Sequence, residues 1–294
     1  MIFLDVYTLG EAFAVVTSGR IRHEHEARLD VTGAELTVAV GLARLGHEAA
    51  WLGKVGGDEL GVRVLSVLRG EGVDVTDARV DEASPTGLLL KESRPGQAAR
   101  VTYYRSGTRL TQGNVPMDRI AAAEVLHVSG ISAALNARDA MHAAIRAAQA
   151  AGVTVSVAVN YRDQLWPDLG EAEEVLSALA CSADVLFVRQ SELDLVKPAL
   201  TGDREVIVIR GARGASVRVN GVRHDAPGVS GPVVDPTGSG DAFVAGYLSA
   251  LLERLHPADR LRRGVLVAAF AASSTSEWQG LPTRAELPLM TFDG

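Results

Sequence analysis

Short runs of apolar and β-branched residues alternate along the chain with longer segments of helical character, and this alternation limits the folds that the chain can adopt. The clearest run covers residues 153–159, VTVSVAV, and its continuity is typical of a strand buried on both faces. Similar short runs occur at 125–128, 184–188 and 206–209, with helical segments between them. Strands that alternate with helices predict an α/β fold with a mostly parallel central sheet.

Several predicted elements have recognisable ends. Asp58 is a suitable N-cap, because its carboxylate can accept a hydrogen bond from the first turn of a helix. Gly46 and Gly152 are suitable helix ends, because glycine readily adopts the left-handed conformation found there. The predicted helices cover 34–45, 58–70 and 137–151, and further strands are expected at 1–6 and 48–55.

Two segments break the alternation. Residues 15–31 and 86–105 contain turn residues and lack a helical period, so we expect them to form β-rich excursions that serve as a small lid. No linker rich in Pro, Gly or Ser divides the chain, and no internal repeat is visible. The sequence therefore predicts a single domain over 1–294, with a homo-oligomer formed through the exposed strand edges of the lid.

Composition narrows the function. The net charge is −7 and the basic residues are scattered, whereas binding to a nucleic-acid backbone requires clustered Lys and Arg. The most apolar late stretch, 265–272, is too short to span a membrane, and residues 1–6 lack the basic start of a signal peptide. The single cysteine, Cys181, cannot form an intramolecular disulfide. We therefore expect a cytoplasmic protein that binds a small molecule and neither nucleic acid nor membrane.

The most informative segment is 235–243, DPTGSGDAF, which follows an expected strand end at Val233–Val234 and precedes a helix over 242–253. Free N–H groups and the helix dipole attract anions at a helix N-terminus, and glycines let the backbone approach a phosphate closely. Asp241 would be repelled by that phosphate, which suggests that it accepts a proton from an attacking hydroxyl. Asp241 could instead only cap the helix, as acids do in many glycine-rich turns.

The segment resembles the C-terminal signature of the ribokinase-like (pfkB) sugar kinases, D-T/P-x-G-A-G-D-x-F, with Ser239 in place of the usual alanine. GAE at 33–35, GKVGGDELG at 53–61 and RGARG at 210–214 are similar to other segments of the family, in the same order. The resemblance implies a three-layer α/β/α sandwich with a β-strand lid, and ATP-dependent phosphorylation of a sugar with Mg²⁺ as the second cofactor.

The same resemblance implies roles for individual residues. Asp241 would be the catalytic base, and the backbone of Gly238, Ser239 and Gly240 would form an anion hole. Glu192 matches an N-x-x-E glutamate that acts on Mg²⁺ through water, although Arg189 stands where the family has the asparagine. The residues implied in ATP binding are Arg210, Gly211, Gly214, Gly238 and Gly240.

Two further segments concern the acceptor. In VTYYR at 101–105, strand alternation places Tyr103 and Arg105 on one face, where they could bind a polyol with an acidic end. In VAVNYR at 157–162, Asn160 and Arg162 follow a buried strand, at the end where ligands bind in such sheets. Arg162 could instead pair with a nearby structural acid, and the Tyr–Arg pair could belong to an ordinary exposed strand.

Together these segments resemble one branch of the family, the 2-keto-3-deoxygluconate kinases. The resemblance implies that Asp241 deprotonates the terminal hydroxyl of the keto-acid. The residues implied in acceptor binding are Gly33, Ala34, Tyr103, Arg105, Asn160, Arg162 and Asp241. The chain departs from the branch at Thr37, Leu89 and Ala158, where Asn, Tyr and Asp are usual.

Other functions stay open at this point. Another sugar kinase, of the fructokinase or ribokinase type, would share the same motifs, and so would a nucleotide-binding regulator that has lost catalysis. A dinucleotide-dependent dehydrogenase is disfavoured, because LGEA at 9–12 after the first strand is not the glycine-rich fingerprint.

Overall fold

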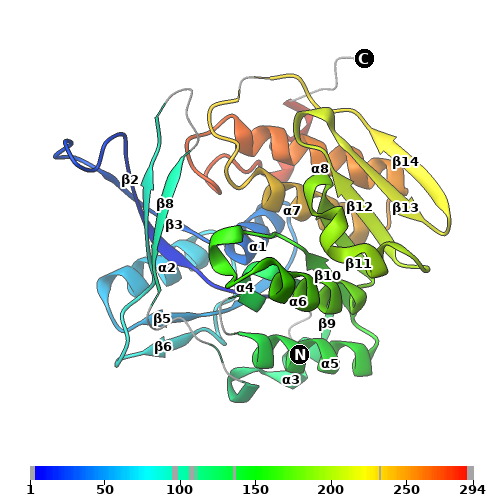
Figure 1. Ribbon diagram of the computed structural model, residues 1–294, viewed down its shortest axis with the longest axis horizontal. Coiled ribbons are helices and arrows are strands. Elements are labelled where there is room, and N and C mark those ends of the chain that lie inside the picture. The colour runs from blue at the N-terminus through cyan, green and yellow to red at the C-terminus, as the bar shows by residue number, and fades with distance from the viewer. Residues whose placement is uncertain are drawn as a thin grey trace.

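The computed structural model describes residues 4–94, 99–105, 110, 112–134, 137–231 and 233–289. An eight-stranded sheet runs through the centre in the order β14-β13-β12-β11-β10-β9-β1-β4 (Figure 1). Its strands are β1 (Leu4–Leu9), β4 (Ala49–Leu52), β9 (Ala123–Ser129), β10 (Thr154–Ala158), β11 (Val185–Arg189), β12 (Glu205–Ile209), β13 (Ala215–Val219) and β14 (Val222–Ala226). The strands from β12 to β4 are parallel, while β13 and β14 form an antiparallel edge. The predicted mostly parallel sheet is confirmed.

Helices cover both faces of this sheet, because its central strands bury side chains on both sides. In β11, Val185 and Phe187 belong to one hydrophobic core, whereas Leu186 and Val188 belong to the other. The first core is covered by α1 (Ala34–Arg44), α2 (Glu59–Gly70), α7 (Ser239–Leu252) and α8 (Pro257–Ala272). The second is covered by α3 (Met117–Ala121), α4 (Gly130–Ala134), α5 (Arg138–Ala151) and α6 (Leu169–Cys181). The three-layer α/β/α architecture is therefore confirmed.

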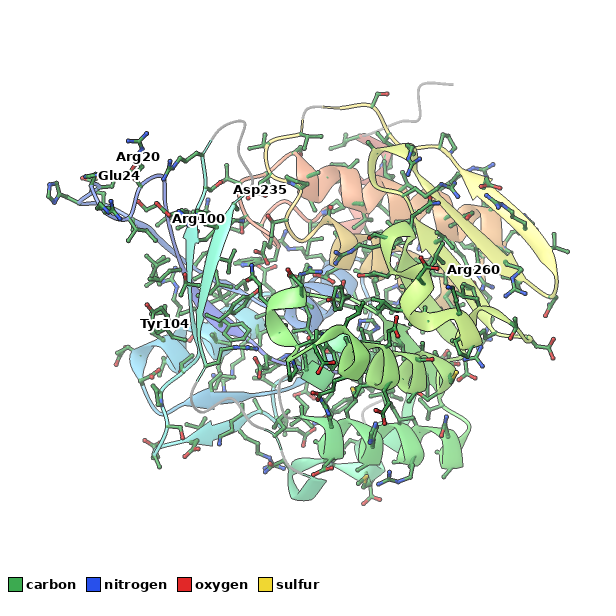
Figure 2. The ribbon with its side chains drawn as sticks, viewed as in Figure 1. Arg20, Glu24, Arg100, Tyr104, Asp235 and Arg260 are labelled. Atoms are coloured by element: carbon green, nitrogen blue, oxygen red, sulfur yellow. The ribbon has the colours of Figure 1, made fainter. Side chains whose placement is uncertain are left out.

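A second sheet forms the lid. Its order is β3-β2-β7-β8, and its strands are β2 (Phe13–Ser18), β3 (Arg28–Thr32), β7 (Leu88–Glu92) and β8 (Arg100–Tyr104). These strands come from the two β-rich segments that the sequence indicated, and they stand beside the main sheet (Figure 1). Phe13, Val15 and Leu89 pack together on the inner face with Tyr103, while Tyr104 is exposed on the outer face (Figure 2).

The predicted helix ends are confirmed. Asp58 Oδ1 accepts a hydrogen bond from Gly61 N (2.9 Å) at the start of α2. Gly46 and Gly152 have φ angles of 86° and 74°, in the left-handed region that favours glycine. Within the described ranges, no helix combines the length and the apolar character that crossing a membrane requires.

Two predicted strands need correction. The expected strand over 48–55 is divided at Gly53: β4 joins the main sheet, whereas β5 (Lys54–Gly56) pairs with β6 (Arg79–Asp81) in a separate small sheet. The strand end expected at Val233–Val234 is not formed. Val234 N instead donates to Ala272 O (2.8 Å) at the end of α8, and both valines are more than half exposed. The apolar pair had the composition of a strand, but none of the strands that the structure describes includes it.

Candidate active site

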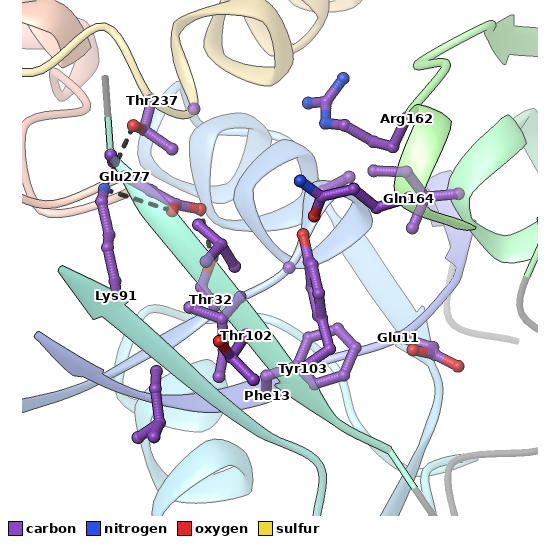
Figure 3. A pocket seen from close by; sticks show the side chains of 18 of the residues that line it. Glu11, Phe13, Thr32, Lys91, Thr102, Tyr103, Arg162, Gln164, Thr237 and Glu277 are labelled. Atoms are coloured by element: carbon purple, nitrogen blue, oxygen red, sulfur yellow. Dashed lines mark hydrogen bonds and ion pairs between the residues drawn. The ribbon is translucent and has the colours of Figure 1, made fainter. Parts of the chain in front are cut away.

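The parallel strands all end at one edge of the main sheet, and a cavity of about 760 Å³ opens there beneath the lid (Figure 3). Such edges are where open α/β sheets bind ligands. The lining comes from the N-termini of α1 and α7, the loop after β10 and the inner face of the lid. Of the residues singled out from the sequence, the lining includes Gly33, Ala34, Tyr103, Arg162, Gly238 and Asp241.

The glycine-rich loop has the geometry of an anion site. Gly238 is the N-cap of α7 with φ 79°, and a Cβ there would lie 2.8 Å from Glu277 Cβ, so both backbone angle and space require glycine. The N–H groups of Gly240 and Asp241 have no acceptor among the described residues. Ser239 differs, because its N–H and its Oγ both bond to Pro236 O (3.2 and 2.7 Å). Both N–H groups lie in the first turn of α7, at the positive end of its dipole, which is an arrangement that can bind an anion.

Asp241 lines the cavity in the first turn of α7, and two side chains behind it fix its position. Asp241 Oδ1 accepts a hydrogen bond from Asn160 Nδ2 (2.9 Å), and Asn160 Oδ1 accepts one from Arg189 Nη2 (2.9 Å). Asn160 has φ 44°, a left-handed conformation that asparagine tolerates better than most residues. Asn160, which the resemblance assigns to acceptor binding, is not among the residues that line the cavity, and its amide donates to Asp241.

Two guanidinium groups lie near Tyr103. Arg162 Nη1 donates to Tyr161 O (3.0 Å), and no carboxylate of the described residues pairs with Arg162, so the alternative of a structural ion pair finds no support there. Arg105 lies over the Tyr103 ring at 5.1 Å, and its buried Nη1 has no hydrogen-bond partner. Burial raises the pKa of Tyr103, while the positive charges of Arg162 and Arg105 act in the opposite direction. Arg162 lines the cavity, and Arg105 lies behind Tyr103 outside the lining.

The departures from the keto-acid kinase pattern fall in different places. Leu89 lines the cavity and packs with Phe13, which makes this part of the lid apolar. Thr37 is buried in α1 and does not line the cavity, and Ala158 belongs to the core beneath the sheet edge. Gly33 permits a close approach of two segments, because a Cβ there would lie 2.4 Å from Glu11 O.

Comparison with known proteins agrees with this geometry. The family described as pfkB family carbohydrate kinase matches residues 4–284. The chain belongs to this family. The predicted class of enzyme, an ATP-dependent carbohydrate kinase, is confirmed with it.

The relatives include two 2-dehydro-3-deoxygluconokinases. That of Bacillus subtilis is 34% identical, covering 97% of this chain and 94% of its own. That of Thermoproteus tenax is 31% identical over 96% of this chain and 93% of its own. A fructokinase of Escherichia coli is 31% identical over 87% of this chain and 90% of its own. The crystal structure of a PfkB protein from Polaromonas superposes with a TM-score of 0.86 at 29% identity, covering 97% and 99% of the two chains.

Two buried acids of the kinase were not singled out from its sequence. Glu35 Oε1 accepts hydrogen bonds from Ser129 Oγ and Ser132 Oγ (2.6 and 2.8 Å), yet burial outweighs them and raises its pKa to about 7. Burial also raises the pKa of Glu277, which accepts a hydrogen bond from Thr32 Oγ1. The charge of Asp241 contributes to both shifts, so three carboxyl groups share one end of the cavity.

A buried lysine on the lid was also missed. Lys91 Nζ contacts Asp235 Oδ2 at 2.8 Å. It also contacts Thr237 Oγ1 (3.1 Å) and Glu277 Oε1 (3.9 Å), as Figure 3 shows. The sequence carried one signal for it: in LLLKE at 88–92, alternation places Lys91 on the same face as Leu89. A lysine on the apolar face of a half-buried strand needs an acidic partner, but the pattern does not say which one.

Glu192, expected to act on Mg²⁺, is buried in the turn after β11. Its Oε1 accepts from Tyr161 N and its Oε2 from Arg189 N (2.9 and 2.8 Å), and it does not line the cavity. Each carboxylate oxygen keeps a second lone pair, which can accept a hydrogen bond from water. In the part of the chain that the structure describes, no group of three or more metal-ligating side chains is found.

The residues expected to bind ATP divide into two places. Gly238 and Gly240 lie at the N-terminus of α7, whereas Arg210, Gly211 and Gly214 form the turn after β12, outside the lining. Arg210 donates to Ser216 Oγ (2.8 Å) and Asp225 Oδ1 (3.0 Å), which fixes the turn. A Cβ on Gly214 would lie 2.1 Å from Ala226 O, so this glycine allows the turn to pack closely on β14.

Proposed function

We propose that the kinase transfers the γ-phosphoryl group of ATP to the terminal hydroxyl of 2-keto-3-deoxygluconate, giving the 6-phosphate. The observation that carries the proposal is the position of Tyr103, in the cavity with Asp241 and within electrostatic reach of two guanidinium groups. Arg162 has no carboxylate partner among the described residues, and Arg105 Nη1 is buried without one. A substrate carboxylate in the cavity would supply the partner that Arg162 lacks, because guanidinium binds carboxylates in a forked geometry, and Arg105 would add positive charge nearby.

The chemistry follows from the anion site and the acid beside it. Asp241 accepts the proton of the acceptor hydroxyl as the oxygen attacks the γ-phosphorus. The free N–H groups of Gly240 and Asp241 face the charge that develops on the transferred group, which stabilises the transition state more than the ground state. Asn160 keeps the carboxylate of Asp241 at the required place.

The nucleotide would extend from the anion site toward the turn at Arg210, Gly211 and Gly214. Mg²⁺ in such sites is held by phosphate oxygens, waters and one or two carboxylates rather than by a protein cage. Glu192 remains the carboxylate that we assign to it, acting through a bound water.

A neutral sugar such as fructose is the second candidate. Leu89 is apolar where the keto-acid kinases usually have tyrosine, and the cavity contains more carboxylates than cationic groups. An anionic acceptor therefore depends strongly on Arg162, and a neutral one would not. The fructokinase among the relatives is consistent with this alternative.

A coupled assay of ADP release with MgATP separates the candidates. The acceptors are 2-keto-3-deoxygluconate, 2-keto-3-deoxygalactonate, gluconate, fructose, ribose and adenosine. We expect the highest kcat/KM on the keto-deoxy acids. Turnover on fructose or ribose alone would refute the acid acceptor and keep a sugar kinase, whereas ATP binding without turnover on any acceptor would favour a regulator.

A further inference from the structure

The Lys91 ammonium is the best-buried cation at the phosphate end of the cavity. Only 5% of its side chain is exposed, whereas the other two lysines of the chain, Lys54 and Lys197, expose 20% and 71%. Its three oxygen partners belong to the glycine-rich loop and to the segment after α8, while Lys91 itself belongs to lid strand β7. One ammonium group thus joins three segments that are far apart in the sequence.

The contacts of Lys91 fix the shape of the loop before Gly238. Asp235 Oδ1 accepts hydrogen bonds from Thr237 N (2.9 Å) and Thr237 Oγ1 (2.6 Å), which bends the chain into a tight turn. Lys91 Nζ binds the other oxygen of Asp235 and the same Thr237 hydroxyl, and so closes a ring of hydrogen bonds. The turn leads directly to Gly238 and the free N–H groups of α7.

The charges around the loop also require a cation. Asp235 and Glu277 lie beside the site that is to receive a triphosphate, and Asp241 adds to the negative potential at Glu277. Burial tends to raise the pKa of Asp235, but hydrogen bonds from Lys91 and Thr237 outweigh it and lower the pKa. Among the described residues, Lys91 is the only group that forms an ion pair with either Asp235 or Glu277.

The position of Lys91 depends on the lid. Lys91 projects from the inner face of β7, two residues after Leu89 and opposite Val101 in the strand register. Lys91, Thr32 and Glu277 also separate the main cavity from a smaller one of about 320 Å³, since they line both. Asp235 lies between the lid and the C-terminal helices (Figure 2), so the ion pair bridges these two parts.

We propose that Lys91 is the positioning residue of phosphoryl transfer: its ammonium holds the 235–238 turn in shape and offsets Asp235 and Glu277 so that MgATP can bind. The proposal rests on the proposed kinase reaction, and it adds a lid residue to the nucleotide site. It implies that a small cation from solution can replace the ammonium when the lysine side chain is shortened.

The test compares three variants with a matched control. K91A removes the ammonium and leaves space, K91M removes the charge and fills the space, and K91R keeps a charge. K54M is the control, because Lys54 also lies on a strand and pairs with an acid, Asp81, but does not line the cavity. We expect K91A and K91M to lower kcat/KM for ATP by about 10²–10³-fold, the usual effect of removing one such group. K54M is expected to stay within threefold of the wild type.

Rescue by a small amine separates positioning from a structural role. Methylammonium chloride, compared with sodium chloride at equal ionic strength, should raise kcat/KM for ATP at least tenfold in K91A and leave K91M and the wild type unchanged. A K91A enzyme within threefold of the wild type would overturn the proposal, as would a loss that methylammonium does not relieve. If K91A does not fold, K91R is compared with K91M. Equal losses of kcat/KM for ATP in these two variants would also overturn the proposal, because K91R keeps the positive charge.

A binding measurement keeps this proposal separate from the proposed acceptor. Titration calorimetry of MgATP without an acceptor should show at least tenfold weaker binding by K91M than by K54M. The wild type could fail to phosphorylate any acceptor and still bind MgATP more tightly than K91M does. That result would refute the proposed acceptor and support the positioning role of Lys91. If the wild type is active, and K91M has the same MgATP affinity and the same kcat as the wild type, the positioning role of Lys91 is refuted and the proposed acceptor is not.

Discussion

Replacement of Asp241 by asparagine tests the assigned base with little disturbance of the structure. Asp241 Oδ1 accepts its hydrogen bond from Asn160 Nδ2 at 2.9 Å, and the amide oxygen of an asparagine can accept the same bond. The substitution therefore removes the charge and the basicity but keeps the contact that orients the side chain. We expect the free energy of unfolding to change by no more than about 1 kcal/mol, the usual net value of one hydrogen bond.

The expected loss of activity is large. General base catalysis contributes about 10²–10⁴-fold to such reactions, which corresponds to about 3–5 kcal/mol in the activation free energy. Because Asp241 repels the phosphates, its neutralisation should leave the affinity for MgATP equal or slightly tighter. A fall in kcat with unchanged nucleotide affinity would identify a group that acts in the chemical step.

The assay combines steady-state ADP release, titration calorimetry of MgATP and thermal unfolding of wild type and D241N. Single-turnover measurements exclude product release as the step that is slowed. The reasoning is refuted by D241N retaining more than about a tenth of the wild-type kcat. A loss of MgATP affinity equal to the loss of kcat would also refute it, because Asp241 would then act in binding.

Three further predictions follow from single contacts. R162A should raise KM for acidic acceptors by roughly 10–100-fold, the range of a lost charge-assisted hydrogen bond. KM for neutral sugars should rise by much less. Equal effects on both classes of acceptor would exclude a substrate carboxylate as the partner of Arg162. N160A removes the hydrogen bond that holds Asp241 and should lower kcat about tenfold or more, with little change in KM for ATP. Unchanged kinetics in N160A would show that Asn160 does not position Asp241. Because burial raises the pKa of Glu35 to about 7, the folded protein holds this proton more tightly than the unfolded chain, and wild-type stability should fall as the pH rises from about 4.5 to about 7, by about 3 kcal/mol. Urea unfolding at pH 5 and pH 8 should show that E35Q loses less stability between these pH values than the wild type does. An equal loss in the two proteins would contradict the raised pKa of Glu35.

The sheet was predictable because its strands are marked by composition. Parallel strands buried on both faces, such as β10 and β11, are continuous apolar runs, and the helix ends at Asp58 and Gly152 follow from local backbone chemistry. The division at Gly53 was not predictable in the same way. It depends on which strands the two halves meet, and those partners lie elsewhere in the sequence.

The motif residues of the site were predictable, but their contacts were not. Asp241 and Gly238 belong to one short segment, so the sequence indicated both together. Lys91 pairs with Asp235 across 144 positions, and Thr32 with Glu277 across 245. Strand alternation could place Lys91 on the inner face of the lid, yet only the packing of the lid against the loop selects its partners.

Arg189 shows how a departure from the family pattern gains a role from the structure. Asn160 has an amide with one accepting and one donating end, and its partners determine which end faces Asp241. Arg189 can only donate, so it takes Asn160 Oδ1 and leaves Nδ2 for Asp241 Oδ1. The asparagine usual at this position can donate or accept, and it would leave that orientation to other contacts. The arginine therefore ensures that Asp241 Oδ1 faces the donating end of the Asn160 amide and not its oxygen.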